Sequence, residues 1–450
     1  MSLAPDDVTW PLSPMDAVMN TFGFVILYIY PPPTSLPYNL GTLHSSFVTL
    51  IEHDYPILMG ELAVDSKTGV VCVKQSASRR QSYTATEPRF ETKLSTSMTT
   101  EQAIQEKSWD FMPMTRGKTE LICAKGTLLA DGGLAIGVDA SHMLFDGEAM
   151  FTLMTVWGQH YNGVEKSNRL VVNHDRHLLM GTGKPSTMLH PEFRVVEIES
   201  TEAQEKRDHL DPASPLPPTA HHLFHFTPSM MKKIKEVATC NGLAQDEVTR
   251  ATYVSTVDAI TALFTVLISR ARGHGKDVRI TTGLNARQRL DPPLPANYVG
   301  NVIFNALSVY SASELQSSDD NAAEVSPNTL GMLARRVRES ILQRDTTYLN
   351  DAISFLTEQS NLSAVKVGTD FFFGSDLMFA SWLHMGMYNA EFNGIHPWYA
   401  CVPRLPCYDG FVMVTEAQRG GEGIDVGVFL ECTAMEKLRK AFLELSFLHK

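Results

Sequence analysis

The sequence contains few cysteines, and their spacing argues against the protein classes that depend on them. Only six of the 450 residues are cysteine, with no CxxC pair and no histidine at zinc-ligand spacing. We therefore expect buried or incidental thiols in a reducing compartment, with neither a disulfide framework nor a bound metal.

Long apolar runs are also missing. The longest, Phe22 to Tyr30, has nine residues, whereas a helix needs roughly twenty to span a bilayer. The N-terminus has no basic region followed by an apolar one, as a secretory signal would. We expect a soluble, cytoplasmic protein that does not interact with a membrane.

Long basic runs are absent as well, and the net charge is −12, which argues against nucleic acid as a partner. An acidic chain can still bind an anionic cofactor through a local basic patch. Two sets of residues qualify: Lys232, Lys233 and Lys235, and the spread Arg270, Arg272, Lys276 and Arg279. The plainer interpretation, a solvated helix face for the first set and a basic helix end for the second, is favoured for the lysines.

A chain that is 44% hydrophobic can bury a sizeable core, and its length indicates more than one domain. The clearest break in composition is a charged and then proline-rich stretch at 202–220, which is typical of a linker. We therefore expect an N-terminal half at 1–201 and a C-terminal half at 221–450.

Strands and helices are mixed through both halves, so the fold class is α/β or α+β. In the first half, alternating or apolar segments predict strands and 3.6-residue periodicity predicts helices. The strands are Phe22–Tyr30, Gly69–Lys74, Thr119–Lys125 and Leu134–Asp139, and the helices are Leu40–Ile51 and Glu148–Tyr161.

The second half carries clearer helix starts. Thr227 and Pro228 form a helix N-cap, and Ser255 to Asp258 form a capping box for a helix ending near Arg272. We also expect an amphipathic helix over Leu330–Ile341, a hairpin of Phe411–Thr415 and Ile424–Glu431, and a surface loop over Ser311–Thr329.

One short motif carries most of the chemical information. His142, Asp146 and Gly147 form the pattern HxxxDG where a predicted strand gives way to a predicted helix. A histidine at such a junction can project into a cleft, and its near-neutral pKa suits it to accept a proton from a hydroxyl or amine. The alternative is a core histidine that precedes a helix-starting turn.

A downstream segment adds to this motif. The stretch from Asn285 to Asn301, with its arginines, prolines and Gly-Asn ending, resembles a segment of the BAHD acyltransferases, which also carry HxxxDG. The residues Leu12–Asp16 and Phe226–Lys235 resemble the family's start and the opening of its second half. The resemblance covers essentially the whole chain.

The resemblance implies a fold, a reaction and partners. The fold is two similar mixed-sheet domains flanked by helices, like chloramphenicol acetyltransferase, with a channel between them. The reaction is transfer of an acyl group from acyl-CoA to an alcohol or amine of a small, secondary metabolite, through a ternary complex. Acetyl is the expected donor because it is the commonest in fungal relatives. Acyl-CoA is a co-substrate, no cofactor is permanently bound, and we expect a monomer.

The resemblance also assigns roles to individual residues. His142 is the general base, and the indole N–H of Trp382 stabilises the oxyanion. Asp146, beside Gly147, forms a structural ion pair with Arg287. We expect the cofactor-binding residues to be Ser255, Thr256 and Ser381, with the CoA phosphates toward the helix that starts at Ser255. Two plainer interpretations remain: Trp382 as packing alone, and Asp146 as an exposed helix cap.

The sequence departs from the family pattern late in the chain. Where members carry DFGWG and then proline, Glu391 to Pro397 keeps only the phenylalanine and the proline. Two alternatives therefore stay open. A condensation-type domain usually has a second histidine where Ser141 stands, and a catalytically silent protein would bind an acyl thioester without turnover.

Overall fold

The first half of the chain is built around a five-stranded sheet with the order β14-β2-β7-β6-β5. At its centre β2 (Gly23–Tyr30) runs antiparallel to β7 (Leu134–Ser141). β2 is almost continuously apolar because both of its faces are covered, one by α2 and α5 and the other by α4. The other elements are β5 (Phe90–Leu94), β6 (Ile122–Leu128), β14 (Tyr399–Cys401), α2 (Leu40–His53), α4 (Thr100–Glu106) and α5 (Gly147–Tyr161).

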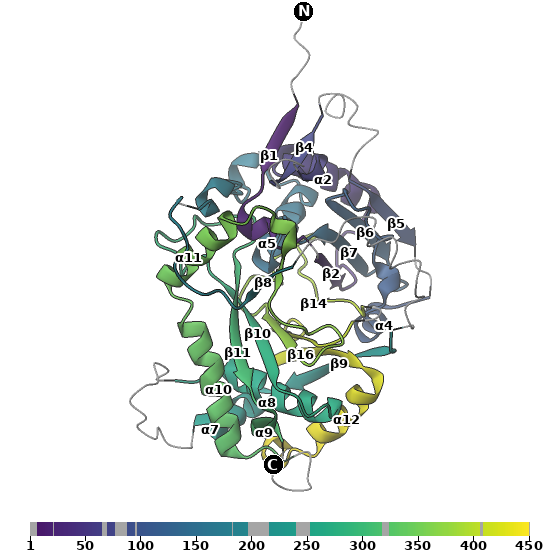
Figure 1. Cartoon of the computed structure of the whole chain (residues 1–450). Coiled ribbons are helices and arrows are strands. Elements are labelled where there is room, and N and C mark those ends of the chain that lie inside the picture. The colour runs from purple at the N-terminus through teal and green to yellow at the C-terminus, as the bar shows by residue number, and fades with distance from the viewer. Residues whose placement is uncertain are drawn as a thin grey trace, which may run out of the picture.

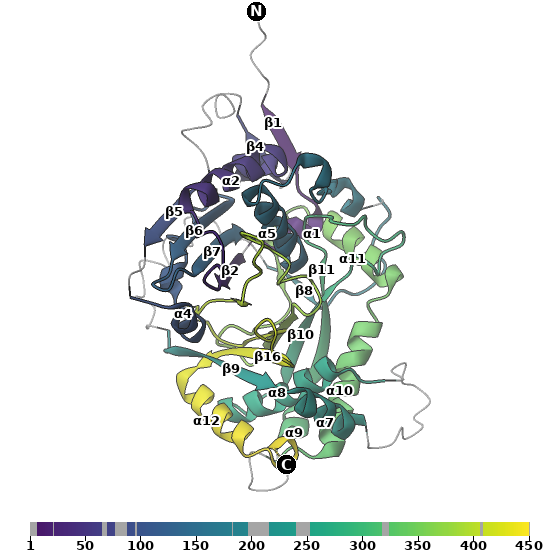
Figure 2. The same cartoon turned by 180° about the vertical axis from the view of Figure 1, so that it is seen from behind.

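The second half is built around a six-stranded mixed sheet with the order β11-β10-β13-β15-β16-β9. The pairs β10–β13 and β13–β15 are parallel and the others are antiparallel. Helices α7, α8, α10 and α12 lie at the far end of the molecule from α2 and α5 (Figures 1 and 2). The bounds are β9 (Thr219–Phe226), β10 (Val278–Asn285), β11 (Ile303–Tyr310), β13 (Leu377–Ser381), β15 (Phe411–Glu416), β16 (Ile424–Glu431), α7 (Pro228–Thr239), α8 (Thr256–Arg272), α10 (Pro327–Leu342) and α12 (Cys432–Leu443).

This computed structural model describes residues 7–20, 22–64, 70–76, 88–94, 97–181, 183–196, 216–239, 253–316, 324–405 and 408–449. Two small sheets and several short helices complete the described part. They are β1 (Val8–Pro11), β3 (Glu61–Val64), β4 (Val71–Gln75), β8 (Phe193–Val195), β12 (Val365–Val367), α1 (Pro14–Ala17), α9 (Ala312–Leu315), α11 (Thr346–Thr357) and α13 (Ser446–His449), with single 3₁₀ turns at Pro56–Met59, Trp109–Phe111, Lys166–Asn168, Arg176–Leu179 and Leu362–Ala364.

The two halves exchange segments. Strand β14 comes from late in the chain but pairs antiparallel with β2, with Tyr399 opposite Ile29, and so forms an edge of the first sheet. In the other direction, Met15 and Val18 near the N-terminus pack into the hydrophobic core of the second half. The segment around β14 crosses between the two sheets (Figures 1 and 2). The halves are therefore interlocked.

The divergent late motif packs against α5 of the first half. Phe392 is fully buried, and its ring lies 5.2 to 5.5 Å from the rings of Tyr30, Trp157 and Tyr161. Helix α5 approaches this segment at Gly158, where a Cβ atom would lie 2.3 Å from the carbonyl oxygen of Glu391. The retained phenylalanine therefore serves the core of the first half.

Most of the predicted elements are confirmed. β2, β7, α2, α5, α7, α8 with its Ser255 capping box, α10 and the β15–β16 hairpin all form within a few residues of their expected bounds. The predicted strand Gly69–Lys74 appears as β4, although Gly69 itself lies outside the described residues.

Three predicted boundaries were wrong. The strand predicted at Thr119–Lys125 begins only at Ile122, because Gly117 and Glu120 close a turn, and it continues to Leu128 by pairing with β7. The loop predicted at 311–329 contains α9, capped by Ser311 with Glu314, and the start of α10; residues 317–323 lie outside the described part.

The third correction concerns the linker. Its last two residues belong to β9, where Thr219 pairs with Glu431. Residues 197–215 lie outside the described residues, so the division of the chain at 202–220 stays a prediction.

The described part of the chain also shows where the cysteines lie and whether a helix could cross a membrane. Cys72, Cys123 and Cys401 are buried and Cys432 is half-buried, while Cys240 and Cys407 lie outside the described residues. Within the described ranges, the helices are too short or too polar to cross a lipid bilayer.

The close approach at Gly158 predicts a destabilising effect of Gly158→Ala. In an unpacked helix this change would stabilise by about 1 kcal/mol. Here the added methyl group meets backbone, so we expect the free energy of unfolding to fall by about 1–3 kcal/mol in urea titrations. Gly117→Ala is the control, since its Cβ would lie 3.8 Å from the nearest atoms. Equal stability of the two variants would contradict the packing argument.

Candidate active site

His142 directly follows β7 and opens the turn that leads into α5. Its backbone N–H donates to the carbonyl of Phe22 at 3.3 Å, and its ring centroid lies 5.4 Å from that of Phe24. The half-buried side chain lines a cavity between the two sheets. Burial lowers the pKa of His142 from its ordinary 6.5, although a hydrogen bond to its own backbone, the charge of Asp146 and the hydrogen bond to Asn301 oppose this shift. The ring is therefore neutral at pH 7.

Asn301 determines which nitrogen of His142 carries the proton. The amide NH₂ of Asn301 donates to the carbonyl oxygen of His142 and to Asp16 Oδ1, at 3.3 Å for the latter. The amide oxygen therefore faces His142 Nδ1, at 3.0 Å. Because a carbonyl oxygen can only accept, Nδ1 of the neutral ring must be the protonated nitrogen. Nε2 is left unprotonated, and it has no hydrogen-bond partner among the described residues.

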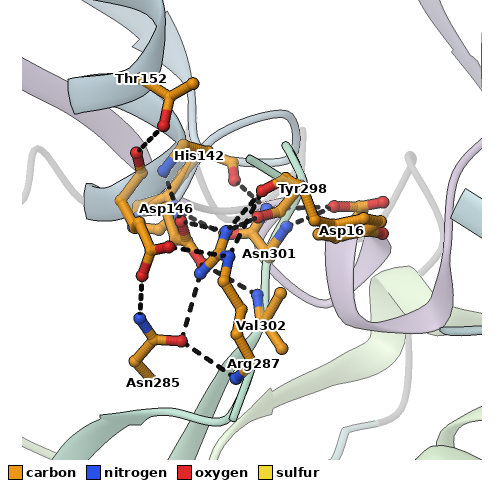
Figure 3. Close-up of polar contacts among 12 residues, drawn as sticks. Asp16, His142, Asp146, Thr152, Asn285, Arg287, Tyr298, Asn301 and Val302 are labelled. Carbon is orange, nitrogen blue, oxygen red and sulfur yellow. Dashed lines mark hydrogen bonds and ion pairs between the residues drawn. The ribbon is translucent and has the colours of Figure 1, made fainter. Parts of the chain in front are cut away.

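Asp16 holds Asn301 from the opposite side. Its carboxylate is fully buried and accepts the backbone N–H of Asn301 at 2.8 Å. Its other oxygen closes the capping box of α1 with Ser13 and lies 3.1 Å from Nε of the buried Arg176. The carboxylate is thus paired, as a buried charge requires. The histidine, the amide and the carboxylate form one connected network (Figure 3).

Asp146 and Arg287 form a bidentate ion pair between the two halves. Arg287 Nη1 and Nη2 donate to the two carboxylate oxygens of Asp146 at 2.8 and 2.9 Å, and both side chains are buried (Figure 3). Asp146 also accepts the N–H of Ala149, which caps α5, and the N–H of Val302. Burial opposes the charge of Arg287, but the ion pair raises its pKa overall. The aspartate makes no hydrogen bond to His142 within the described part.

Gly147 explains how Trp382 can lie beside the turn. A Cβ atom on Gly147 would lie 2.9 Å from both Cδ1 and Nε1 of the indole, so a side chain there would displace the ring. Trp382 stacks on Phe24 at 5.5 Å and meets Phe151 edge to face at 5.4 Å. Its N–H has no hydrogen-bond partner in the described ranges, and the residue lines the same cavity as His142. The indole of Trp382 therefore packs against neighbouring rings and also has an N–H group available to donate.

The cavity at His142 lies between the halves. Its wall includes Phe24 of the first sheet and Met378, Ser381 and Met413 of the second. Its volume is about 930 Å³, including the part that opens to solvent.

A second cavity adjoins the first along the chain segment after β13. Ser381 and Trp382 line the first cavity, and the next two residues, Leu383 and His384, line the second. Ser255 and Thr256 lie in this second cavity, at the N-terminus of α8. Of the predicted cofactor-binding residues, Ser381 is therefore placed apart from the other two.

The two basic patches considered from the sequence have different positions. Lys235 lines the second cavity, together with Arg419. Arg272 and Arg279 instead form ion pairs with Asp409 and Asp376. Among the described residues of the two patches, Lys235 is therefore the one placed to bind an anionic ligand in the second cavity.

The structure thus brings His142, Asp146, Gly147, Arg287 and Trp382 together, as the sequence analysis expected. Two further residues, Asp16 and Asn301, were quoted only as part of the resemblance and had no assigned role. In the sequence, both polar residues stand among apolar neighbours. This pattern was a signal that each side chain would need a hydrogen-bond partner once buried.

Comparison with known proteins shows the family of the chain. A family model described as "Transferase family" matches residues 2–445. A hydroxycinnamoyltransferase of Narcissus pseudonarcissus is 25% identical over 321 residues, which cover 70% of this chain and 67% of that protein.

Solved structures share the fold. The structure of F. graminearum TRI101 complexed with coenzyme A and deoxynivalenol has a TM-score of 0.74 at 16% identity, covering 96% of this chain and 97% of the other. Vinorine synthase has a TM-score of 0.64 at 18% identity, covering 97% and 93%. Since the family model covers nearly the whole chain, the protein belongs to this transferase family, the BAHD acyl-CoA-dependent acyltransferases.

Proposed function

We propose that this enzyme transfers an acyl group, preferably acetyl, from acyl-CoA to a hydroxyl or amino group of a small secondary metabolite. The observation that carries the proposal is the state of His142. Its ring is neutral, Nδ1 is engaged by Asn301, and Nε2 is free at the wall of a cavity between the halves. A nitrogen in this state can accept a proton from an acceptor that enters the cavity.

The reaction then proceeds in one ternary complex. Nε2 of His142 takes the proton of the acceptor hydroxyl while its oxygen attacks the thioester carbon. The indole N–H of Trp382 donates to the developing oxyanion. Collapse of the tetrahedral intermediate expels the CoA thiolate, which receives the proton from the imidazolium. A base of this kind contributes roughly 10²–10⁴-fold, so positioning and oxyanion stabilisation supply the rest.

CoA would enter through the second cavity. Backbone N–H groups at the start of α8, with Ser255 and Thr256, and the side chains of Lys235 and Arg419 can receive its phosphates. Asp258 of the capping box adds a negative charge there, but Arg338 pairs with it at 2.7 Å. The pantetheine arm would pass the segment that joins the cavities and bring the thioester to Ser381 and His142. The coenzyme A present in the TRI101 structure supports a donor of this chemistry.

We further propose that the halves 1–201 and 221–450, joined by 202–220, act together as a cytoplasmic monomer without a permanently bound cofactor. The condensation-type alternative is not favoured, because Ser141 stands where a second histidine is usual. A silent binding protein would have no use for the free Nε2 of His142. The His142→Ala experiment, which measures thiol release, distinguishes a silent binding protein from an acyltransferase.

His142→Ala should lower kcat for thiol release from acetyl-CoA by about 10²-fold or more. CoA affinity by calorimetry and the thermal midpoint should change little, because the ring faces a cavity. In the unsubstituted enzyme kcat/KM should fall as pH drops, with a midpoint below 6.5, because only neutral imidazole accepts a proton and burial lowers its pKa. His177→Ala, an exposed histidine, is the control. Near-normal turnover of His142→Ala would rule out the base.

Asn301→Ala tests the positioning of that base. Loss of the amide frees the tautomer and orientation of the ring, so kcat should fall about tenfold or more with little change in KM. The hydrogen bond that His142 donates to Asn301 raises the pKa of His142, so its loss should move the acid limb of the pH profile to lower pH. Asn305→Ala, which also removes a buried amide, should leave that limb in place. If the acid limb of the pH profile of Asn301→Ala stayed at the pH of the unsubstituted enzyme, the positioning role of Asn301 would be contradicted.

Asp146→Asn should act mainly through stability. It keeps a capping oxygen for α5 but removes the bidentate partner of the buried guanidinium of Arg287, which is left with only the half-exposed carboxylate of Glu148 at 3.7 Å. Loss of a buried ion pair costs about 3–5 kcal/mol in urea unfolding. Asp345→Asn is the matched control, because Asp345 also caps a helix but at an exposed position, where about 1 kcal/mol or less is expected. Unchanged stability with a large loss of turnover would instead make Asp146 a direct participant.

A further inference from the structure

The cavity at His142 has no charged side chain among the described residues that line it. From this we infer that the acceptor is an uncharged, largely apolar alcohol. The inference rests on the proposed function and narrows it, since the reaction alone accepts alcohols and amines of any charge.

The wall of the cavity is mostly thioether, aromatic and aliphatic. Four methionines contribute to it, Met19, Met378, Met385 and Met413, and the aromatic rings of Phe22, Phe24, Trp382, Tyr408 and Phe411 cover much of the rest. Apolar walls of this kind bind hydrocarbon and ring surface and exclude water. Methionine side chains also adapt to differently shaped ligands. The wall therefore fits a family of related apolar skeletons.

The wall has few polar groups, and two of them are already committed. His142 is reserved for proton transfer, and the amide oxygen of Asn285 already accepts from the backbone N–H and Nη1 of Arg287. The hydroxyl of Ser381 accepts a long bond from Leu383 N at 3.4 Å and keeps its own proton free. Together with the phenol hydroxyl of Tyr408, it can orient a neutral ligand, but hydroxyl groups cannot balance an ionic group.

Charged groups are instead found in the second cavity, which is lined by Lys235, Arg419 and Glu416. The charges of a CoA thioester would therefore be met on the donor side, before the chain reaches Ser381. An acceptor that carries a carboxylate would have to place it against methionine and phenylalanine, which is strongly unfavourable without a partner. A protonated amine would likewise find no carboxylate there and could not give up its proton readily.

A matched pair of acceptors tests the inference. Methyl 4-(hydroxymethyl)benzoate and 4-(hydroxymethyl)benzoate share a skeleton and a reacting hydroxyl and differ in one charge. With acetyl-CoA we expect kcat/KM for thiol release to be roughly 100-fold or more higher for the ester. 4-(Methoxycarbonyl)benzylamine should be poorer than the ester alcohol at pH 7. Equal rates for acid and ester, or a preference for the amine, would overturn the inference.

A positive charge placed in the wall should weaken the discrimination between ester and acid. Met385 is half-buried, so Met385→Lys can keep its ammonium partly hydrated while reaching into the cavity. We expect the ratio of ester to acid kcat/KM to fall at least tenfold in Met385→Lys and to remain high in Met385→Leu. Thermal unfolding of both variants checks that they are folded, and Met413→Lys repeats the test if Met385→Lys is not. A ratio unchanged by a folded lysine variant would count against this cavity as the acceptor site.

Binding measurements separate this inference from the proposed function. Calorimetric titration of ester and acid into the protein saturated with CoA needs no turnover. Tighter binding of the ester without thiol release from any acceptor would sustain the inference and contradict the reaction. Rapid turnover with equal binding of acid and ester would sustain the reaction and contradict the inference. A rate that rises steeply with acyl-chain length while ignoring acceptor charge would assign the apolar wall to the donor and also overturn it.

Discussion

The buried ion pair between Asp146 and Arg287 joins the turn after His142 to the loop after β10, and thus one half of the molecule to the other. Its carboxylate also caps α5 and accepts the N–H of Val302, next to Asn301. A shift of either half would leave one of two buried charges unpaired, which is costly. The alignment of the histidine with the residues of the opposite sheet follows from this constraint.

The two cavities between which the donor would pass differ in the polarity of their linings. Ionised side chains line the cavity at the start of α8, while thioether and aromatic groups line the cavity at His142. The imidazole of His142 is neutral because it lies at the apolar cavity, where burial lowers its pKa. The apolar surroundings that keep the imidazole neutral are thus the same ones that disfavour an ionic ligand.

Local patterns in the sequence predicted the long elements and the HxxxDG turn, because periodicity and capping depend on neighbours in the chain. The pairing of Asp146 with Arg287 came from family resemblance, since the two residues are 141 positions apart. The contact of Asn301 with His142 joins residues 159 positions apart and has no local signature. Gly147 matched the motif, but its reason, the indole of Trp382 against its Cα, exists only in three dimensions. β14 has three residues, too few to show a period.

Strand β14 has a consequence for how the chain is made. Until residue 401 has been synthesised, the edge of β2 that β14 will cover has open backbone N–H and C=O groups. An apolar strand with an open edge readily pairs with other chains. The N-terminal half therefore leaves the ribosome as an unfinished sheet, and its completion must wait for most of the C-terminal half. Synthesis and folding of the two halves are in this way coupled in time, and a ribosome that stalls between them would release an aggregation-prone fragment.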